Sequence, residues 1–381
     1  MKVAGDWLEH RGTRALLAAL ESAGYRALFV GGCVRNAVLG LPVADTDLAT
    51  DALPETVSNI AENTGFRAVP TGIEHGTVTV LADGRAHEVT TFRRDVETDG
   101  RRAVVAFSTH IEEDAARRDF TMNALYADAL GNVLDPLGGL SDTLARRVRF
   151  VGEAEARIRE DYLRILRFFR FHACYGDPTL GLDAEGLAAC AAFSAGLETI
   201  SRERIGAEMR KLLGARDPSP AVAAMAASGV LAQVLPGADH RALAPLVHLE
   251  ASAPPRWLRR LVVLGGQAVD TALRLSRPET RDLAALVAAV SGMDSPAALG
   301  WRLGADLGTD AVLARAAVLG GPPSADWQAE VSRGAAAVLP VTAADLMPGL
   351  EGAALGARLK ALEARWLASG LRLTRDDLLK S

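Results

Sequence analysis

A strand-like run that ends in two glycines is the feature that most constrains this chain. The apolar residues Ala27–Val30 predict a buried strand, and Gly31 and Gly32 follow it directly. Paired glycines let the backbone turn sharply into a helix, whose first free N–H groups can bind phosphate. Arg35 falls in the first turn of that helix. The order of these residues predicts an anion site at the end of a strand.

Two aspartates, Asp45 and Asp47, come next and flank Thr46. Residues at i and i+2 of a strand point to the same face, so both carboxylates would lie close enough to share metal ions. Isolated pairs of this kind also occur in ordinary surface turns, and the glycine pair upstream is what favours a catalytic role. Glu88 begins a later strand-like run. It is either a third carboxylate that positions an attacking 3′ hydroxyl or a surface charge on an edge strand.

Composition and sequence patterning predict a soluble protein with two or more domains. The chain has 381 residues, of which 49% are hydrophobic and 23% charged, enough for two or more cores. The first 150 residues mix short strand-like runs with helical patches and turn residues, as in an α/β or α+β domain, and helical periodicity dominates from about Glu153 onward. Three cysteines without CxxC spacing, and no apolar segment of signal or transmembrane type, predict a cytoplasmic protein without membrane contact. The net charge of −5 means that an RNA partner needs a local basic surface.

Two polar segments of the first 150 residues leave alternatives open. Residues 93–110 are centred on Asp99-Gly100, a turn signal, and form either a mobile loop or an exposed hairpin. Further on, Arg117 and Arg118 begin the sequence RRDFTMNA, whose side chains can hold ribose and phosphate oxygens. The alternative for Asp119 and Thr121 is to cap the start of a helix. Capping does not explain the arginine pair.

A third polar segment, Ile158–His172, has the periodicity of one helix. Spacing by three and four places Asp161, Arg164 and Phe168 on one face of that helix, with Arg167 and Arg170 one step round. An Asp/Arg pair at i, i+3 is commonly a surface ion pair worth about 0.2–0.5 kcal/mol. A carboxylate beside a guanidinium can also read cytosine or adenine, since both bases show an amino donor beside a ring-nitrogen acceptor. Uracil and guanine show the opposite pattern.

Taken together, these segments resemble the class II nucleotidyltransferase superfamily, which contains tRNA CCA-adding enzymes and bacterial poly(A) polymerases. Five segments match in the family's order and spacing: GGCVRN with DTD, RRDFTMNA, DPLGG, REDYLRILRFFRF and ISRERIGAEMRKLL. The segment Val341–Met347, with Gly356 and Trp366, is similar to the tail of long bacterial members. The resemblance therefore covers nearly the whole chain.

The resemblance implies an α+β fold. We expect a polymerase-β-like nucleotidyltransferase head with a mixed five-stranded sheet, followed by an all-helical neck, body and tail. The catalytic head is expected at residues 1–150 and the neck, with base recognition, at 151–215. The body is expected at residues 216–290, and the tail, with tRNA binding, at 291–381.

The resemblance also implies roles for individual residues. Asp45 and Asp47 would bind Mg²⁺, and Glu88 completes the predicted catalytic set. The nucleotide-binding residues are expected to be Gly31, Gly32, Arg35, Arg118, Asp161, Arg164, Arg167 and Arg170. Gly32 and Arg35 would contact the triphosphate, and Asp161 with Arg164 would read the base edge.

The implied reaction adds C, C and then A to the tRNA 3′ end from CTP and ATP, without a nucleic-acid template. The expected partners are the tRNA 3′ end and elbow, with no DNA and no membrane. A poly(A) polymerase would share all five motifs but typically carries a basic extension, whereas this chain has a sequence pI near 5.9. An enzyme that adds only CC or only A remains an alternative. A non-catalytic tRNA-binding module is less consistent with the motifs, and the absence of a His-Asp dipeptide argues against a fused phosphohydrolase.

Two positions depart from the family pattern. Asn36 stands where the first motif usually ends in aspartate, which removes a charge near the triphosphate. Arg102-Ala103 replace a common His-Pro in the loop that the family uses to switch from CTP to ATP. Both metal carboxylates are retained, so we expect altered tuning and not loss of activity.

Overall fold

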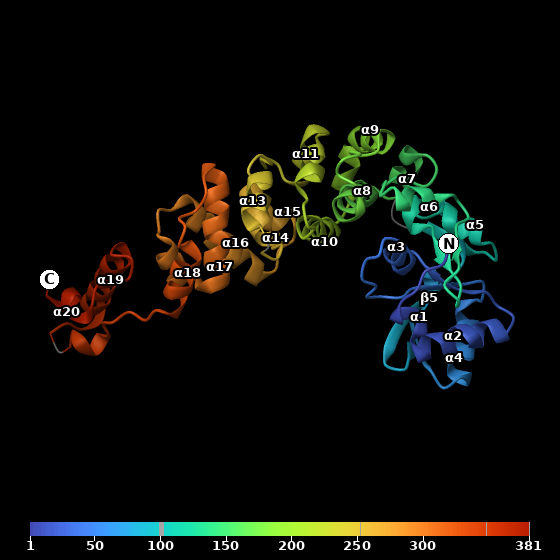
Figure 1. Ribbon diagram of the computed structural model, residues 1–381, viewed down its shortest axis with the longest axis horizontal. Helices are drawn as coiled ribbons and strands as arrows, with labels where there is room; N and C mark the ends of the chain where they lie inside the picture. The colour runs from blue at the N-terminus through green and yellow to red at the C-terminus, as the bar shows by residue number, and fades with distance from the viewer. Residues whose placement is uncertain (99–102, 252, 348, 381) are drawn as a thin grey trace. The chain divides into compact units, whose positions relative to one another are not determined.

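The computed structural model describes residues 1–98, 103–251, 253–347 and 349–380 (Figure 1). The chain divides into two compact units. The first comprises Met1–Ile200 with Ser228–Val230, and the second comprises Ser201–Ala227 with Leu231–Ser381. All the residues predicted to act in catalysis or nucleotide binding belong to the first unit.

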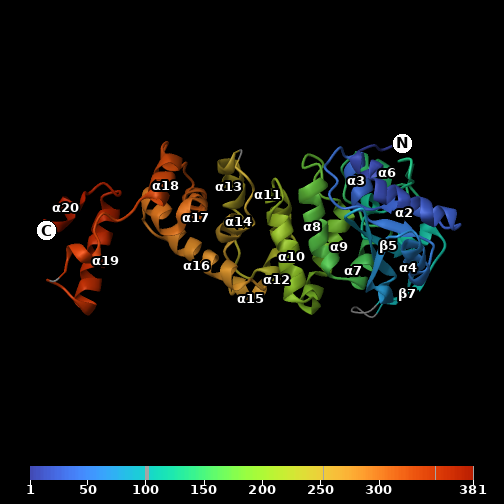
Figure 2. The same ribbon diagram turned by 90° about the horizontal axis from the view of Figure 1, so that it is seen from below.

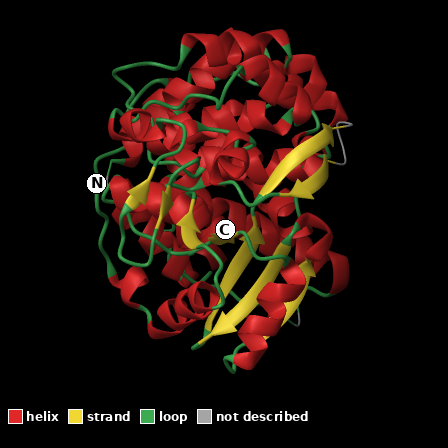
Figure 3. Cartoon of the chain, turned by 90° about the vertical axis from the view of Figure 1, so that its right-hand side faces the viewer, coloured by secondary structure: helices red, strands yellow, loops and turns green. Residues whose placement is uncertain are grey.

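A mixed sheet of seven strands forms the centre of the first unit, in the order β3-β4-β5-β2-β1-β8-β9 (strands in yellow, Figure 3). The strands are β1 (Ala27–Val30), β2 (Leu48–Thr50), β3 (Arg67–Gly72), β4 (Thr77–Ala82), β5 (Arg85–Thr91), β8 (Tyr126–Ala127) and β9 (Val133–Leu134). Only β2 and β5 pair in parallel among these neighbours. The α+β class and the mixed sheet are confirmed, but the predicted count of five strands is wrong. The additional strands, β8 and β9, have two residues each, which is too short to produce an alternating pattern.

Helices cover one face of the sheet, and the segment that contains RRDFTMNA packs against the other face. The first helices of the unit are α1 (Asp6–Glu9), α2 (Arg11–Ser22) and α4 (Pro54–Asn63). Helices α2 and α4 lie side by side and both contact β5 (Figures 1 and 2). Alternate residues of β4 enter the core below these helices: Val78 and Val80 are fully buried, as are Leu16 and Leu17 of α2. This alternation fixes which side chains remain for the other face.

The segment with two open interpretations is a hairpin. Strands β6 (Arg93–Thr98) and β7 (Ala103–Phe107) pair antiparallel, with Arg93 opposite Phe107. The predicted turn at Asp99-Gly100, and the departure at Arg102, lie outside the described residues. Helix α5 (Ile111–Ala116) follows and packs against β6.

The predicted single helix at 158–172 is wrong, because the chain breaks it at Asp161. Helix α7 covers Ala154–Glu160 and α8 covers Leu163–Tyr175. Asp161 has extended backbone angles, φ −154° and ψ 105°. Its side-chain Oδ1 accepts a hydrogen bond from Leu163 N at 3.1 Å. Aspartate often competes with the helix for backbone N–H groups in this way, and periodicity alone did not reveal the interruption.

The described residues of the second unit form helices and loops only. The longer helices are α10 (Arg202–Leu213), α11 (Ser219–Ala227), α13 (Leu243–Glu250), α14 (Trp257–Leu264), α16 (Arg277–Ser291), α17 (Pro296–Leu319), α18 (Trp327–Ala336) and α19 (Gly352–Ala368). Helix α17 contains a non-helical residue, Gly304, at φ 78°. No helix in the described ranges has both the length and the apolar character needed to cross a bilayer. Ser201 caps α10, since its side chain accepts a hydrogen bond from Arg204 N.

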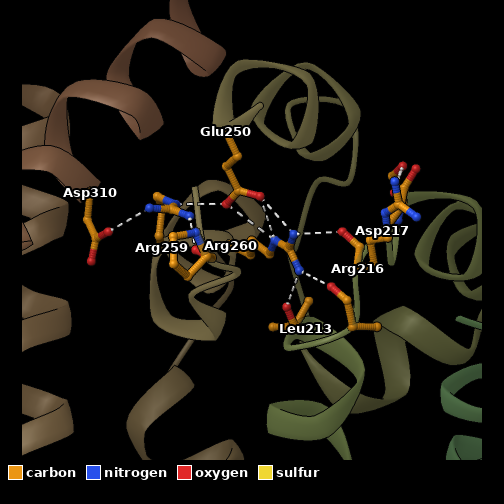
Figure 4. A network of polar contacts seen from close by, with 10 residues as sticks. Leu213, Arg216, Asp217, Glu250, Arg259, Arg260 and Asp310 are labelled. Atoms are coloured by element: carbon orange, nitrogen blue, oxygen red, sulfur yellow. Dashed lines mark hydrogen bonds and ion pairs between the residues drawn. The ribbon is translucent and has the colours of Figure 1, made fainter. Parts of the chain in front are cut away.

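A buried group of charged side chains joins four helices of this unit (Figure 4). Arg259 bonds Glu250 Oε1 at 2.7 Å and Asp310 Oδ1 at 3.0 Å. Arg260 bonds Glu250 Oε2 at 2.7 Å and donates to the carbonyl of Leu213 at 2.7 Å. Each arginine is only 1% exposed. Because Arg260 donates to carbonyls at the end of α10, it also offsets the partial negative charge of that helix end.

Candidate active site

Strand pairing brings the predicted motifs to one edge of the sheet. Strand β1 ends where its antiparallel neighbour β2 begins, and Val30 N donates to Asp47 O at 3.0 Å. On the other side of β2, Leu48 pairs with Val89 of the parallel strand β5. Glu88 therefore stands beside Asp47, one residue before the paired positions. The glycine turn, the two aspartates and Glu88 meet although 57 residues separate the first from the last.

Asp45 and Asp47 lie in the extended segment just before β2, and the prediction that they are on a strand is wrong by a few residues. The predicted alternation of side chains along this segment is nevertheless present. Thr46 is buried, at 5% exposure, whereas both aspartates and Glu88 are exposed. The pKa of Asp47 is raised, first by loss of water around it and then by the negative charges of Glu88 and Asp45. Arg118 acts in the opposite direction.

These carboxylates fit a divalent cation that is shared with a substrate. Among the described residues, no three His, Cys, Asp or Glu side chains gather into a complete metal site. Two exposed carboxylates with hard oxygen donors match the few protein ligands that Mg²⁺ commonly takes when substrate phosphates supply the others. A cation would also relieve the repulsion between Asp47 and its acidic neighbours.

The glycine turn has the predicted form. Gly31 has φ 70°, and helix α3 (Gly32–Val38) starts immediately after it. A Cβ atom at Gly31 would lie 3.3 Å from Arg118 Nη1 and 3.6 Å from Asn123 O. Both the positive φ and this close approach favour glycine. The turn therefore places the Arg118 guanidinium directly against the backbone that precedes α3.

Arg118 is held by two residues that the sequence reasoning missed. Its Nη2 donates to Asp114 Oδ2 at 2.9 Å and its Nε donates to Tyr126 Oη at 3.2 Å. Tyr126 Oη in turn donates to Asp114 Oδ2 at 2.7 Å. Burial alone would raise the pKa of Asp114, but the adjacent Arg118 and Arg117 guanidinium groups lower it to about 2. The signal was available, because Asp114 precedes these arginines by four and three residues in a helical stretch.

Arg35 is buried beneath the glycine turn. Its Nη1 donates to Asn123 Oδ1 at 2.5 Å, and its guanidinium lies 3.9 Å from the centre of the Tyr175 ring. Burial lowers its pKa. Asn36 Oδ1 accepts from Arg35 Nη2 at 2.9 Å, while Asn36 Nδ2 donates to Pro42 O at 2.8 Å. An aspartate at position 36 has no proton to donate to that carbonyl, so the departure from the family pattern adds a contact to the segment leading to Asp45.

Three of the predicted arginines gather around one ring. Arg170 lies 4.6 Å from the centre of the Phe171 ring, and Arg35 and Arg167 lie at 5.2 and 5.3 Å from it. Arg167 also bonds Asp119 Oδ2 through Nε at 2.7 Å. Helix α8 is thereby joined both to α3 and to the segment that contains Arg118.

Asp161 and Arg164 are close in the chain but do not share a helix face. Asp161 stands in the break between α7 and α8, and Arg164 lies in the first turn of α8. Arg164 Nη1 donates to Glu160 Oε2 at 2.6 Å, and its Nη2 donates to Arg117 O at 3.3 Å. The guanidinium predicted to read a base is therefore held by a different carboxylate in this structure.

Comparisons with known proteins agree with this geometry. Residues 27–149 match the model of the poly A polymerase head domain, and residues 180–241 match a probable RNA and SrmB-binding site of polymerase A. The crystal structure of the Bacillus stearothermophilus CCA-adding enzyme in complex with CTP superposes with a TM-score of 0.74 at 32% identity. That superposition covers 94% of this chain and 93% of the other. The chain belongs to the CCA-adding enzyme family.

Curated CCA-adding enzymes match part of the chain at higher identity. The enzyme of Streptococcus pyogenes serotype M2 is 45% identical over 214 residues, and that of Geobacillus thermodenitrificans is 43% identical over 224 residues. These matches span about half of the relatives' lengths, 52% and 54%, and 56% and 58% of this chain. The Thermotoga maritima CCA-adding enzyme complexed with tRNA has the same fold, with a TM-score of 0.71 at 18% identity.

Proposed function

We propose that this protein is a tRNA nucleotidyltransferase that adds C, C and then A to the tRNA 3′ end. CTP and ATP would supply the nucleotides without a template, and pyrophosphate would leave at each step. The observation that carries the proposal is the strand register that places Asp45 and Asp47 beside Glu88 at the glycine turn. It occurs in a chain that is 32% identical to a CCA-adding enzyme over nearly its full length.

Mg²⁺ is the cofactor that we propose, held by Asp45 and Asp47. When bound, the ion would stabilise negative charge on the triphosphate and on the attacking oxygen. Glu88 would accept a hydrogen bond from the 3′ hydroxyl of the tRNA and orient it. Arg118, which acts electrostatically on Asp47 and lies against Gly31, would bring positive charge to the nucleotide phosphates. Gly32 and Arg35 complete the proposed triphosphate side.

Base selection is proposed for Asp161 and Arg164, with Arg167 and Arg170 at the sugar or phosphate. Arg164 bonds Glu160 in the structure, so reading a base would require this arginine to share or exchange that carboxylate. Arg164 is only 14% exposed in its side chain, which favours a restricted set of positions for the guanidinium.

The tRNA would be bound by its 3′ end and elbow. The match of residues 180–241 to a probable RNA-binding model supports RNA contact close to the predicted neck and body, 151–215 and 216–290. The head at 1–150 and the tRNA-binding tail at 291–381 remain our assignment. The cytoplasmic location predicted from cysteine usage belongs to the same proposal.

The test is nucleotide incorporation with defined tRNA ends. The protein is incubated with Mg²⁺ and tRNAs that end before, within or after CCA, with each nucleotide supplied singly and together. Completion to CCA, and no further, is expected. Products that stop at CC, or that gain only the final A, would identify a partial enzyme, whereas long A tails would identify a poly(A) polymerase. Binding of tRNA without any incorporation would leave a non-catalytic module.

A further inference from the structure

A buried chain of hydrogen bonds lies directly behind the three carboxylates. Thr46 stands between Asp45 and Asp47, and His87 stands immediately before Glu88. Because side chains alternate along both segments, the carboxylates are exposed while Thr46 and His87 turn inward. His87 is fully buried. The same backbone that presents the acidic groups therefore places these two side chains against each other.

The chain of contacts runs from the catalytic segment to the first helices. His87 Nδ1 lies 2.9 Å from Thr46 Oγ1, and His87 Nε2 lies 3.1 Å from Thr13 Oγ1 of α2. Thr13, also fully buried, has its Oγ1 2.9 Å from His10 Nδ1. Burial lowers the pKa of His87 and outweighs the nearby Thr46 carbonyl, which acts to raise it. The ring is therefore neutral near pH 7.

Only one arrangement of protons satisfies the three side-chain contacts, and in it the longer approach of His87 Nδ1 to the carbonyl oxygen of Thr46, at 3.3 Å, carries no proton. His10 Nδ1 accepts a hydrogen bond from Thr13 N at the start of α2, so it carries no proton. The Thr13 hydroxyl must then donate to His10, which leaves its oxygen to accept from His87 Nε2–H. A neutral ring protonated on Nε2 has a bare Nδ1. The Thr46 hydroxyl is therefore the donor to His87 Nδ1, and its side-chain rotamer is fixed.

We propose that His87 is a positioning residue for metal binding. It fixes the Asp45-Thr46-Asp47 segment by accepting a hydrogen bond from the Thr46 hydroxyl. This inference rests on the function proposed above. Residues 41–47 have no regular secondary structure of their own. Asn36 holds the segment at Pro42 and Val30 N holds it at Asp47 O. The bond to His87 holds the residue between the two aspartates, where displacement would move both carboxylates together.

The test compares three variants, two of which lack one buried hydroxyl. Thr46→Val removes the donor to His87, whereas Thr46→Ser keeps it. Thr91→Val is the matched control, because Thr91 lies on β5, is 1% exposed, and donates to Ala52 O at 2.7 Å beyond the other end of β2. Two quantities are measured in the full-length protein. They are the Mg²⁺ concentration for half-maximal CTP incorporation and, by electron paramagnetic resonance, the affinity for Mn²⁺ in the presence of CTP.

We expect Thr46→Val to raise the Mg²⁺ concentration for half-maximal incorporation about tenfold and to lower the affinity for Mn²⁺ about tenfold. This is the lower end of the range for loss of a group that orients metal ligands. Thr46→Ser should remain within about twofold of the unsubstituted protein, and Thr91→Val should lower the melting temperature without affecting the metal. Equal metal affinity in Thr46→Val and Thr91→Val would overturn the proposal. If the unsubstituted protein incorporates no nucleotide, the proposed function fails, while Mn²⁺ affinity still tests the role of His87.

A measurement on the unsubstituted protein keeps the proposal testable if Thr46→Val does not fold. Nitrogen-15 NMR of labelled histidine distinguishes a protonated ring nitrogen from a bare one. We expect His87 to show a protonated Nε2 and a bare Nδ1. A protonated Nδ1 would make Thr46 an acceptor and would overturn the proposed arrangement.

Discussion

Within the first unit, the carboxylate edge (Asp45, Asp47 and Glu88) and the segment that we propose reads the base (Asp161 and Arg164) are built in different ways. Asp45, Asp47 and Glu88 are placed by strand register, which a core of fully buried residues enforces. Asp161 and Arg164 stand at a break between two helices, where Arg164 donates to Glu160 and to backbone carbonyls and Asp161 accepts from Leu163 N. Strand register tolerates little adjustment, whereas one hydrogen bond can be exchanged for another. We infer that catalysis uses the fixed edge and nucleotide choice uses the adjustable break.

Asp47→Ala should produce the largest effect and test the fixed edge. Loss of a metal carboxylate removes several kcal/mol of transition-state stabilisation, so CTP incorporation should fall by about a thousandfold. Because Asp47 is exposed and its side chain is not part of the core, tRNA affinity and melting temperature should stay unchanged. Single-turnover incorporation and filter binding measure the two properties. Loss of tRNA binding together with activity would show that Asp47 is structural.

Arg164→Ala should affect nucleotide choice more than metal use. Removing a charged hydrogen-bond donor costs about 1.5–3 kcal/mol, so the preference for CTP and ATP over UTP and GTP should fall about 10- to 100-fold. The matched control is Arg159→Ala, which removes an arginine from an exposed pair with Glu155 on α7. Incorporation of each nucleotide, measured at several Mg²⁺ concentrations, distinguishes an effect on nucleotide selectivity from an effect on the Mg²⁺ requirement. Unchanged selectivity with a raised Mg²⁺ requirement would reverse the comparison.

Asp114→Asn should have a smaller effect that reaches both regions. Asp114 holds Arg118 at the carboxylate edge and Arg117, whose carbonyl accepts from Arg164. Its pKa falls from 3.8 to about 2 in the folded protein, equivalent to about 2 kcal/mol of stability. Because the folded value is the lower one, this stability is present above pH 3.8 and is lost as the pH falls toward 2.

Urea unfolding therefore should show the variant about 2 kcal/mol less stable near pH 7, with the difference shrinking near pH 2. Glu155→Gln, at the exposed pair on α7, is the control and should change stability by less than about 1 kcal/mol. A difference for Asp114→Asn that is independent of pH would mean that packing, and not charge, makes Asp114 important.

Local sequence patterns predicted the parts of the site that depend on one segment. The turn at Gly31 and Gly32 and the alternation around Thr46 follow from glycine geometry and strand period, and the structure has both. Bonds between distant segments left no such pattern. Tyr126 reaches Asp114 because β8 pairs with β1, and β8 is too short to be recognised from periodicity.

Helical periodicity likewise did not predict the break at Asp161. The apolar spacing from Ile158 to His172 continues across Asp161, although the backbone is extended there. A side chain that takes over one backbone hydrogen bond changes the path without changing the pattern of apolar residues. The charged group around Arg259 could not be predicted from local patterns either, because its partners Glu250 and Asp310 lie on separate helices.

That charged group limits how the sequence of the second unit can drift. Arg259 and Arg260 share one carboxylate, Glu250, so replacing Glu250 alone leaves the buried Arg260 with backbone carbonyls as its acceptors and without the carboxylate that it bonds. Such single losses cost about 3–5 kcal/mol, whereas replacing a whole set by apolar residues can be neutral. Substitutions here are therefore accessible to evolution mainly as compensated sets, and the positions should covary in descendants of this chain.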